Sequence, residues 1–486
     1  GGVAGIAAAV ALAERGVRVT LLEREPYLGG RVGAWPVALP DGSAATMSRG
    51  FHAFFRQYYN LRSLLRRFDP ELDSLVPVGD YPLWHSSGSC DSFARLPTRP
   101  PFNVMAFVRQ SPTFALRDLG RVHLPTALSL LDVAFPETYA ELDGESAQDF
   151  LDRLRFPPAA RHLALEVFAR SFFAHPGEFS AGELVAMFHA YFVGSAEGLL
   201  FDVPADTYAA TLWDPAARLL RRLGVAVRCG AAVETVETSP SNRAGGRDRV
   251  VRVIHPGGLV EAEAVVLATD PDALRRLVAA SLALGDEGWR ARVAAQRSAP
   301  PFAVWRLWLD RPVEPGRTAF LGTSGFGPLD NVSVLERFEA EAANWSGRTG
   351  GSVVELHAYA LPAGHDDDGL RSDLLRGLHT VYPETGRARA VHDEWLMRAD
   401  CPLPAPGSWA TRPTVTTPDP RVVLAGDGVR CDLPVALMER AATTGFQAAD
   451  ALLGRWSVTG HDLWSVPTGP RLAPWRWPRP AVRRRR

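Results

Sequence analysis

The sequence Gly1-Gly2-Val3-Ala4-Gly5 opens the chain and decides how the rest of it is interpreted. Residues 6–15, IAAAVALAER, are small, apolar and helix-favouring, and Gly16 follows them where a helix would end. Residues 17–22, VRVTLL, are rich in β-branched side chains and predict a strand that leads to Glu23. Two glycines, a helix, a turn, a strand and an acidic residue therefore follow one another in order.

This order is typical of the fingerprint that binds the pyrophosphate of a dinucleotide. Glu23 lies 21 positions after Gly2, and the fingerprint places its ribose-binding acid about 20 positions on. Gly2 would let the backbone approach the pyrophosphate, Gly5 would let helix and strand pack closely, and amides from Gly1 onward would hold the phosphates. A glutamate repels a 2′-phosphate, so FAD or NAD is favoured over NADP. In this interpretation the first strand and the first fingerprint glycine would precede Gly1.

Two further segments favour FAD over NAD. Gly29-Gly30-Arg31 suits a second turn against the pyrophosphate, which predicts Gly30 and Arg31 as cofactor contacts. Residues 421–427, RVVLAGD, predict a short apolar strand that ends in Gly426 and Asp427, and residues 439–449 predict a helix. This pair resembles the strand and helix that rejoin the FAD sheet in two-domain flavoproteins, where the aspartate meets the ribityl or phosphate region.

The patterns between these ends predict an α/β fold, with a Rossmann-like FAD-binding domain and an inserted α+β substrate domain. Residues 223–228 and 232–237 alternate like paired strands, and Val233 is a further predicted cofactor contact. Residues 264–270 predict a buried strand that leads into a helix. The FAD-binding domain is expected to comprise residues 1–60, 205–275 and 395–455, and the substrate domain residues 61–204 and 276–394.

The predicted substrate domain is rich in aromatic side chains. Residues 302–309 and 352–359 predict strands, and Ser180-Ala181-Gly182-Glu183 is typical of a capping box before a helix that reaches about Phe192. The aromatic residues of the first inserted segment include Phe168, Phe172, Phe173, Phe188, Tyr191, Phe192 and Phe201. They fit either a well-filled core or a channel that holds a long apolar ligand by buried area.

Composition excludes several classes of function. With 53 basic and 54 acidic residues among 486, the net charge of −1 gives no basic surplus for gripping nucleic acid. All the basic residues are arginine, so Schiff-base chemistry and lysine-dependent phosphate loops are excluded. The four cysteines lack Cys-x-x-Cys spacing, and residues 365–368, HDDD, follow Pro-Ala-Gly as a solvated turn would. We therefore expect no metal site.

The most distinctive stretch is residues 47–61, MSRGFHAFFRQYYNL. Its Gly-x-His-x-Phe-Phe…Tyr-x-Asn-Leu pattern resembles the carotene desaturase branch of the FAD-dependent amine oxidase-like superfamily. The similarity runs from Gly1 to about Leu453 and is supported by residues 171–173, 197–204 and 426–428. Within this branch the chain is most similar to bacterial carotenoid φ-ring synthases, also called isorenieratene synthases or β-carotene desaturase/methyltransferases.

The resemblance implies oxidation of the β-ionone rings of β-carotene to aromatic rings, with one methyl group moved to the neighbouring carbon. It implies that FAD accepts hydride, that proton loss follows the methyl shift, and that an electron acceptor separate from this chain completes the cycle. His52 is the predicted base, because an imidazole is mostly neutral near physiological pH. Phe54, Phe55, Tyr58 and Tyr59 are expected either to face a passing cation or to pack in the core.

Several alternatives stay open from the sequence. Asp432 and Glu439 are weaker candidates for the base, and Arg49 and Arg56 either contact the cofactor or lie in solvent. The chain would also fit an acyclic carotene desaturase or carotene cis–trans isomerase of the same fold. A flavin amine or porphyrinogen oxidase, and a carotenoid carrier without catalytic activity, are the remaining readings.

The end of the chain predicts a disordered basic tail over residues 456–486. Trp475, Trp477 and four terminal arginines would suit docking on anionic lipid, and apolar residues at a channel mouth would serve equally. No uninterrupted apolar run reaches the roughly 18 residues of a membrane span. We therefore expect a cytoplasmic protein that is peripherally associated with the membrane.

Overall fold

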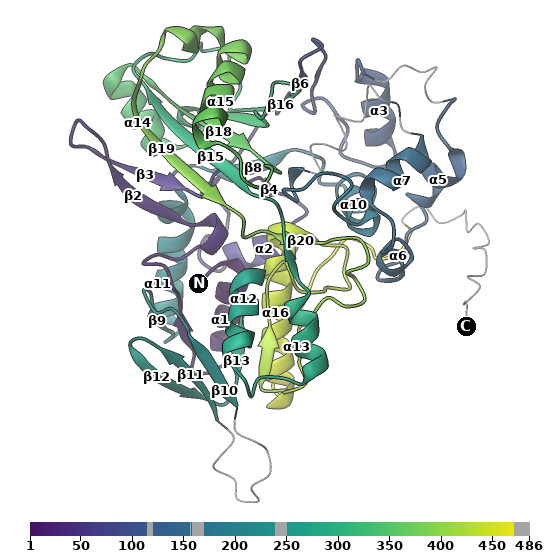
Figure 1. The fold of residues 1–486 in the computed structure, drawn as a ribbon, viewed down its shortest axis with the longest axis vertical. Helices are drawn as coiled ribbons and strands as arrows, with labels where there is room; N and C mark the ends of the chain where they lie inside the picture. Colours follow the sequence, from purple (N-terminus) through teal and green to yellow (C-terminus); the bar gives the residue numbers. More distant parts are fainter. Residues whose placement is uncertain (114–119, 156, 158–169, 239–249, 471–486) are drawn as a thin grey trace, which may run out of the picture.

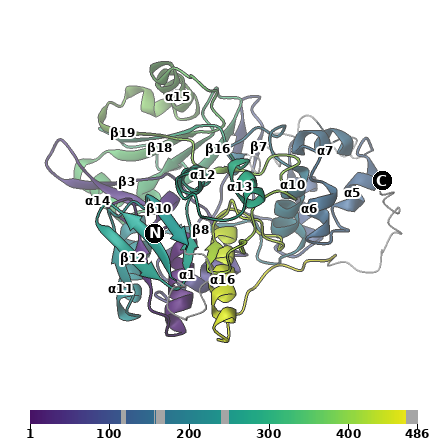
Figure 2. The same cartoon turned by 60° about the horizontal axis from the view of Figure 1, so that its bottom comes forward.

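The computed structural model describes residues 1–113, 120–155, 157, 170–238 and 250–470. Its first helix, α1 (Val3–Glu14), packs side by side with the last one, α16 (Leu437–Arg455), as both ribbon views show (Figures 1 and 2). Small residues allow this approach, since a Cβ on Gly445 would lie 2.4 Å from the carbonyl oxygen of Ala4. The two ends of the described chain therefore share one core.

Two short parallel strand pairs flank these helices. Strand β1 (Thr20–Leu22) pairs with β9 (Ala226–Arg228), and β13 (Val265–Leu267) pairs with β21 (Val422–Leu424). Segments separated by about 200 and 155 residues are thus joined, as parallel pairing requires long crossover connections.

The expected pairing of residues 223–228 with 232–237 is wrong. After β9, the backbone amides of Gly230 and Ala231 donate to the carbonyl oxygens of Glu25 and Glu23, so the chain continues beside the first segment instead of turning back. Strand β10 (Thr235–Thr238) begins a separate antiparallel sheet. That sheet consists of β10, β11 (Val251–His255) and β12 (Gly258–Ala262). Helix α12 (Pro271–Ala280) packs against β10, α13 (Glu287–Ala294) packs against α12, and α11 (Asp214–Arg222) packs against β9 and α1.

A seven-stranded sheet forms the upper part of Figure 1. In order across the sheet, its strands are β19 (Ala390–Arg398), β15 (Phe302–Leu309), β18 (Ser352–Ala358), β17 (Asn331–Val334), β16 (Phe320–Ser324), β6 (Leu83–His85) and β7 (Cys90–Asp91). One face packs apolar side chains against helix α15 (Asp367–Val381), where Leu374 and Leu378 are fully buried. Strand β19 runs across the domain boundary expected at residues 394–395.

A helical lobe lies beside the sheet, on the right of Figures 1 and 2. Its helices are α3 (Phe102–Gln110), α5 (Leu124–Ser129), α6 (Glu137–Glu141), α7 (Ala147–Leu154) and α10 (Ala181–Phe188). Ser180 caps α10 as expected by accepting from the Gly182 amide. Glu183 does not complete the capping box, because its buried carboxylate pairs with Arg412 at 2.7 Å and Arg440 at 2.5 Å. Phe168, expected among the aromatic residues here, lies outside the described residues.

Shorter elements connect these parts. They are β2 (Ala34–Ala38), β3 (Ala44–Ser48), β4 (Phe54–Phe55), α2 (Tyr59–Leu65), β5 (Leu75–Pro77), β8 (Phe201–Pro204), β14 (Arg297–Ser298), α14 (Ala340–Thr349), β20 (Pro402–Leu403) and single helical turns at Gly30–Val32, His189–Val193, Ala209–Trp213, Leu335–Arg337 and Pro383–Arg387.

The prediction of a disordered tail is wrong for residues 456–470, which pack against the rest of the chain. The backbone of Trp464 donates to and accepts from the side chain of Asn60, and His461 lies 2.9 Å from the carbonyl oxygen of Ala11. Further along, the Phe135 amide donates to the carbonyl oxygen of Thr468. These contacts hold the segment against α1, α2 and the helical lobe. Residues 471–486 lie outside the described residues.

Candidate active site

A cavity of about 1240 Å³ lies between α1 and the seven-stranded sheet. Its lining includes Gly1 and Gly2, His52, and aromatic side chains such as Tyr81 and Phe93. Pockets for a single small ligand usually measure about 300–1,000 Å³. The cavity therefore has room for a cofactor and a substrate at the same time.

Two glycine turns meet at the start of α1 and form a cradle. The Gly29 amide donates to the Gly1 carbonyl oxygen at 2.8 Å, and a Cβ on Gly30 would lie 3.0 Å from the Cα of Gly2. Gly29 has a φ of +116°, and a Cβ there would lie 2.4 Å from the indole nitrogen of Trp213. A side chain at Gly29 would therefore clash with Trp213, and one at Gly30 would crowd Gly2 at the N-terminus of α1, where a phosphate group is favoured.

Other predicted cofactor contacts surround this cradle. Glu23, at the end of β1, and Val233 both line the cavity, as do Gly426 and Asp427 after β21. Gly5 lies on α1, where a Cβ would be 3.3 Å from the Cβ of Ala268, so it serves the packing of the helix.

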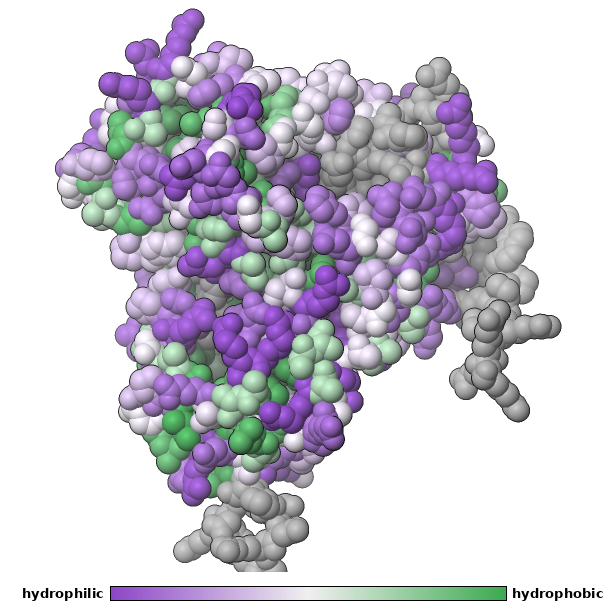
Figure 3. Space-filling view, in the orientation of Figure 1, coloured by the Kyte–Doolittle hydropathy of each residue, from purple (hydrophilic) through white to green (hydrophobic). Residues whose placement is uncertain are grey.

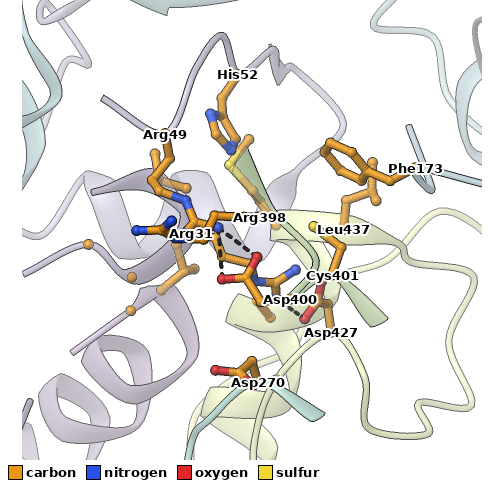
Figure 4. A pocket seen from close by; sticks show the side chains of 18 of the residues that line it. Arg31, Arg49, His52, Phe173, Asp270, Arg398, Asp400, Cys401, Asp427 and Leu437 are labelled. Carbon is orange, nitrogen blue, oxygen red and sulfur yellow. Dashed lines mark hydrogen bonds and ion pairs between the residues drawn. The ribbon is translucent and has the colours of Figure 1, made fainter. Parts of the chain in front are cut away.

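Two ion pairs line the cavity near the cradle (Figure 4). Arg31 pairs with Asp427, and Arg49 donates to both carboxylate oxygens of Asp400 at 2.6 and 2.8 Å. Burial alone would lower the pKa of Arg31, but Asp427 outweighs it and raises the pKa, so the guanidinium stays charged. An acid at the ribose position, a glycine cradle and a fixed arginine together fit a dinucleotide such as FAD.

His52 lines the cavity and lies above these pairs in Figure 4. Its Nδ1 is 2.8 Å from the carbonyl oxygen of Gly50. Because a carbonyl can only accept, Nδ1 carries the proton and Nε2 is left as an acceptor. Burial lowers the pKa of His52 to about 4, so the imidazole is neutral.

The structure divides the four predicted aromatic residues. Phe55 and Tyr58 line the cavity, and the Tyr58 hydroxyl forms a 2.6 Å hydrogen bond with that of Tyr191. The expectation that Phe54 and Tyr59 face the substrate is corrected. Phe54 is buried in the core because neighbours on a strand point to opposite faces, and Tyr59 donates to Glu197 outside the cavity.

The weaker candidates have structural partners. Glu439 is buried and accepts from the amides of Asn60 and Leu61 at the start of α2. Asp432 pairs with Arg430 on the surface. Arg56 pairs with Asp202 at 3.3 Å and does not belong to the described lining of the cavity, whereas Arg49 does.

The cavity wall formed by the sheet contains residues that the sequence analysis did not single out. Phe302 on β15, Asn331 on β17, and His357 and Tyr359 on and after β18 all face the cavity. A signal was present, because polar residues alternate along the otherwise apolar segment 352–359. A polar side chain in a buried strand needs a hydrogen-bond partner, so three such side chains on one face indicate that this face of the sheet borders a polar or functional site.

Comparison with known proteins identifies the family of this chain. The model of the flavin containing amine oxidoreductase family matches residues 3–453. The chain belongs to this family. Its members include flavoenzymes, so the predictions of an FAD cofactor and of an FAD-dependent oxidoreductase are confirmed at the level of the family.

Two relatives are similar to this chain over nearly its whole length. It is 59% identical to the carotenoid phi-ring synthase of Streptomyces griseus, over 97% of this chain and 90% of that protein. The carotenoid phi-ring synthase of Chlorobaculum tepidum is 28% identical over 96% of this chain and 89% of its own length. These matches confirm the resemblance drawn from residues 47–61.

The predicted fold class is confirmed by comparison with a solved structure. Cyclohexylamine oxidase from Brevibacterium oxydans aligns with a TM-score of 0.66 at 14% identity, and covers 94% of this chain and 98% of that one. At this identity the likeness concerns the fold alone.

Proposed function

We propose that this flavoenzyme oxidises the β-ionone rings of a carotenoid, β-carotene, to aromatic φ-rings and shifts one methyl group to the neighbouring carbon. The observation that carries the proposal is the 59% identity, over 97% of the chain, to a protein named carotenoid phi-ring synthase. When bound, FAD would serve as the acceptor of the hydride that leaves the ring. The reaction belongs to carotenoid (isorenieratene) biosynthesis and needs an electron acceptor separate from this chain.

The walls of the cavity support a long apolar substrate. Tyr81 and Phe93 stack at 4.5 Å, and the rings of Phe51 and Phe320 also lie 4.5 Å apart. All four line the cavity. Such a wall would hold a polyene by buried area, exclude water, and offer aromatic faces to a positively charged ring.

The test is expression in a bacterial host that accumulates β-carotene. Pigments are extracted and identified by chromatography, absorption spectrum and mass. The proposal expects a product that is lighter by two hydrogens for each oxidation and carries aromatic end rings. Unchanged β-carotene beside a protein that holds FAD would overturn it, and turnover of acyclic carotenes would then identify a desaturase of the same fold.

We also propose that the protein lies in the cytoplasm and contacts the membrane through the helical lobe. Phe102 and Met105 on α3 are 61% and 64% exposed, and Leu124 on α5 is 64% exposed. The opposite side of α3 buries Phe107, which stacks at 5.5 Å on the cavity residue Phe93. Helix α3 therefore separates the cavity from an exposed apolar surface, where a bilayer-dissolved substrate would arrive.

Charge and cysteine chemistry support the same location. Arg99, Arg109 and Arg121 are exposed near these two helices and would meet anionic headgroups. The free cysteines are consistent with a reducing compartment.

On the face shown in Figure 3, apolar side chains are scattered among polar ones outside the grey residues. Within the described parts of the chain, no helix has the length and apolar character needed to cross a membrane.

A further inference from the structure

Three polar side chains form a line along β18 toward the cavity. Glu355, His357 and Tyr359 are two residues apart, so the strand projects them from one face of the sheet. Glu355 is 0% exposed, whereas His357 and Tyr359 line the cavity. His357 Nε2 lies 2.9 Å from Glu355 Oε1, and His357 Nδ1 lies 2.6 Å from the Tyr359 hydroxyl. A continuous hydrogen-bonded path therefore connects the interior with the cavity.

Arg306 fixes the direction of these hydrogen bonds. Its guanidinium donates twice to Glu355 Oε2, at 2.7 and 3.0 Å. Burial alone would raise the pKa of Glu355, but Arg306 and His357 outweigh it and lower the pKa to about 2. The Phe51 amide also points at His357 Nε2, at 3.3 Å, but the carboxylate of Glu355 lies closer, at 2.9 Å. Because the carboxylate can only accept, His357 donates from Nε2 to Glu355 and keeps a lone pair on Nδ1.

Tyr359 is the member of the line that meets the substrate space. Burial raises the pKa of its phenol, so the hydroxyl carries its proton and donates it to His357 Nδ1. Asn331 donates to the same oxygen at 3.0 Å. One lone pair of the Tyr359 oxygen remains. The ring of Tyr359 contacts that of Phe173, which in turn contacts Phe302, and all three residues line the cavity.

We propose that Tyr359, His357 and Glu355 act together as the base that removes the ring proton after hydride loss and methyl shift. This inference rests on the proposed function. The C–H bond breaks, and its electron pair becomes a new ring double bond and neutralises the cation; a second loss of hydride and proton completes the aromatic ring. The proton binds the Tyr359 oxygen while the Tyr359 proton passes to His357 Nδ1. The imidazolium that results is held by the carboxylate of Glu355, as in other hydroxyl–imidazole–carboxylate triads.

His52, the base predicted from the sequence, differs in its partner. Its Nδ1 donates to the Gly50 carbonyl oxygen, which carries only a partial charge with which to stabilise an imidazolium. His357 has a full carboxylate at the equivalent position. The geometry therefore favours Tyr359 and His357 as the proton acceptor and leaves His52 as a neutral wall of the cavity.

The test uses the FAD-loaded protein and four variants. Tyr359→Phe removes the hydroxyl and keeps the ring, and His357→Gln keeps an acceptor that cannot take a proton. His52→Gln probes the alternative base. Tyr382→Phe is the matched control, since Tyr382 is buried beneath Arg317 and is not among the described residues that line the cavity. Flavin absorbance and melting temperature verify that each variant is loaded and folded.

Two signals are measured. Flavin bleaching is followed after anaerobic mixing with β-carotene, and aromatic product is quantified after an artificial quinone is added as electron acceptor, because each aromatic ring requires two hydride removals and the flavin must be reoxidised between them. We expect Tyr359→Phe and His357→Gln to bleach the flavin within a few-fold of the wild-type rate and to form product about 10²–10⁴-fold more slowly. The wild-type product step should slow in D₂O, and Tyr359→Phe should lose this solvent effect. The control should behave as wild type.

The outcomes separate the two proposals. Absence of aromatic product from the wild-type protein would overturn the proposed function, whatever the variants do. Product formation by Tyr359→Phe within threefold of wild type would overturn the base assignment alone. The same holds if bleaching and product fall together in this variant, or if only His52→Gln loses product.

Discussion

Gly50 lies directly against the imidazole of His357. A Cβ on Gly50 would be 2.7 Å from Cε1 of His357 and 2.9 Å from Cγ2 of Val304. The carbonyl oxygen of the same glycine accepts from His52 and from the hydroxyl of Tyr208, at 2.8 and 2.9 Å. One residue without a side chain therefore sets the positions of both imidazoles that border the cavity.

Replacing this glycine tests that relationship. Gly50 has a φ of +94°, and Gly42 has a φ of +79° with no atom within 4 Å of its added Cβ. Both Gly→Ala variants should lose about 1–2 kcal/mol from left-handed backbone strain. Gly50→Ala should lose a further 1–3 kcal/mol or so from the clash, and should form less aromatic product. Urea unfolding measures the difference, and equal losses in the two variants would show that the contact with His357 is not tight.

The pair of Arg31 and Asp427 should matter for retention of the cofactor. Asp427→Ala leaves the Arg31 guanidinium beside the cradle without its carboxylate, which should lower the free energy of unfolding by about 1–3 kcal/mol. The purified variant should also hold less flavin for each chain, as measured by absorbance. Asp432→Ala is the control, because Asp432 pairs with Arg430 on the surface and such pairs contribute about 0–1 kcal/mol. Equal flavin content in the two variants would contradict the prediction.

The cofactor half of the site was predictable because its signals are local in sequence. Gly2, Gly30, Glu23 and Asp427 each stand in a short segment whose spacing reports a turn, a strand end or a helix start. The structure brings all four to one cavity. Local geometry fixes where each side chain lies, so no knowledge of distant strand pairing was needed.

The substrate half depends on pairing that the sequence does not reveal. The role of Tyr359 depends on its hydrogen bond with Asn331, and that of Glu355 on its hydrogen bonds with Arg306. These partners come from strands β17 and β15, which lie on either side of β18. The errors have the same origin. Phe54 was expected on the cavity side of its strand but points to the core, and β9 was expected to pair with the wrong segment. Alternation of apolar and polar residues identifies a strand, but it reveals neither which face of the strand is buried nor which strand pairs with it.

His52 should make the protein less stable in mild acid. Its pKa is lowered to about 4 by burial, while an unfolded histidine has a pKa near 6.5. Between these values the unfolded chain binds a proton that the folded chain does not, so stability falls as the pH drops from 6.5 toward 4. The loss attributable to His52 is at most about 3 kcal/mol.

His52→Gln tests this assignment. Its unfolding free energy should depend less steeply on pH over this interval than that of the wild-type protein, as measured by urea unfolding at a series of pH values. His175→Gln, at an exposed position, is the control for loss of an imidazole. An unchanged pH profile in His52→Gln would show that the folded protein tolerates a charged His52.

The exposed side of α3 should carry membrane binding. Phe102→Ser with Met105→Ser removes two apolar side chains that are 61% and 64% exposed, so the fold should be retained. Each should contribute about 1.5–3 kcal/mol when buried in lipid, so co-sedimentation with anionic liposomes should weaken at least about tenfold. Leu282→Ser is the control, because Leu282 is 86% exposed but lies just beyond α12, away from the helical lobe. Removal of residues 471–486 tests the tail separately: if only this deletion releases the protein from liposomes, the tail and not α3 makes the contact.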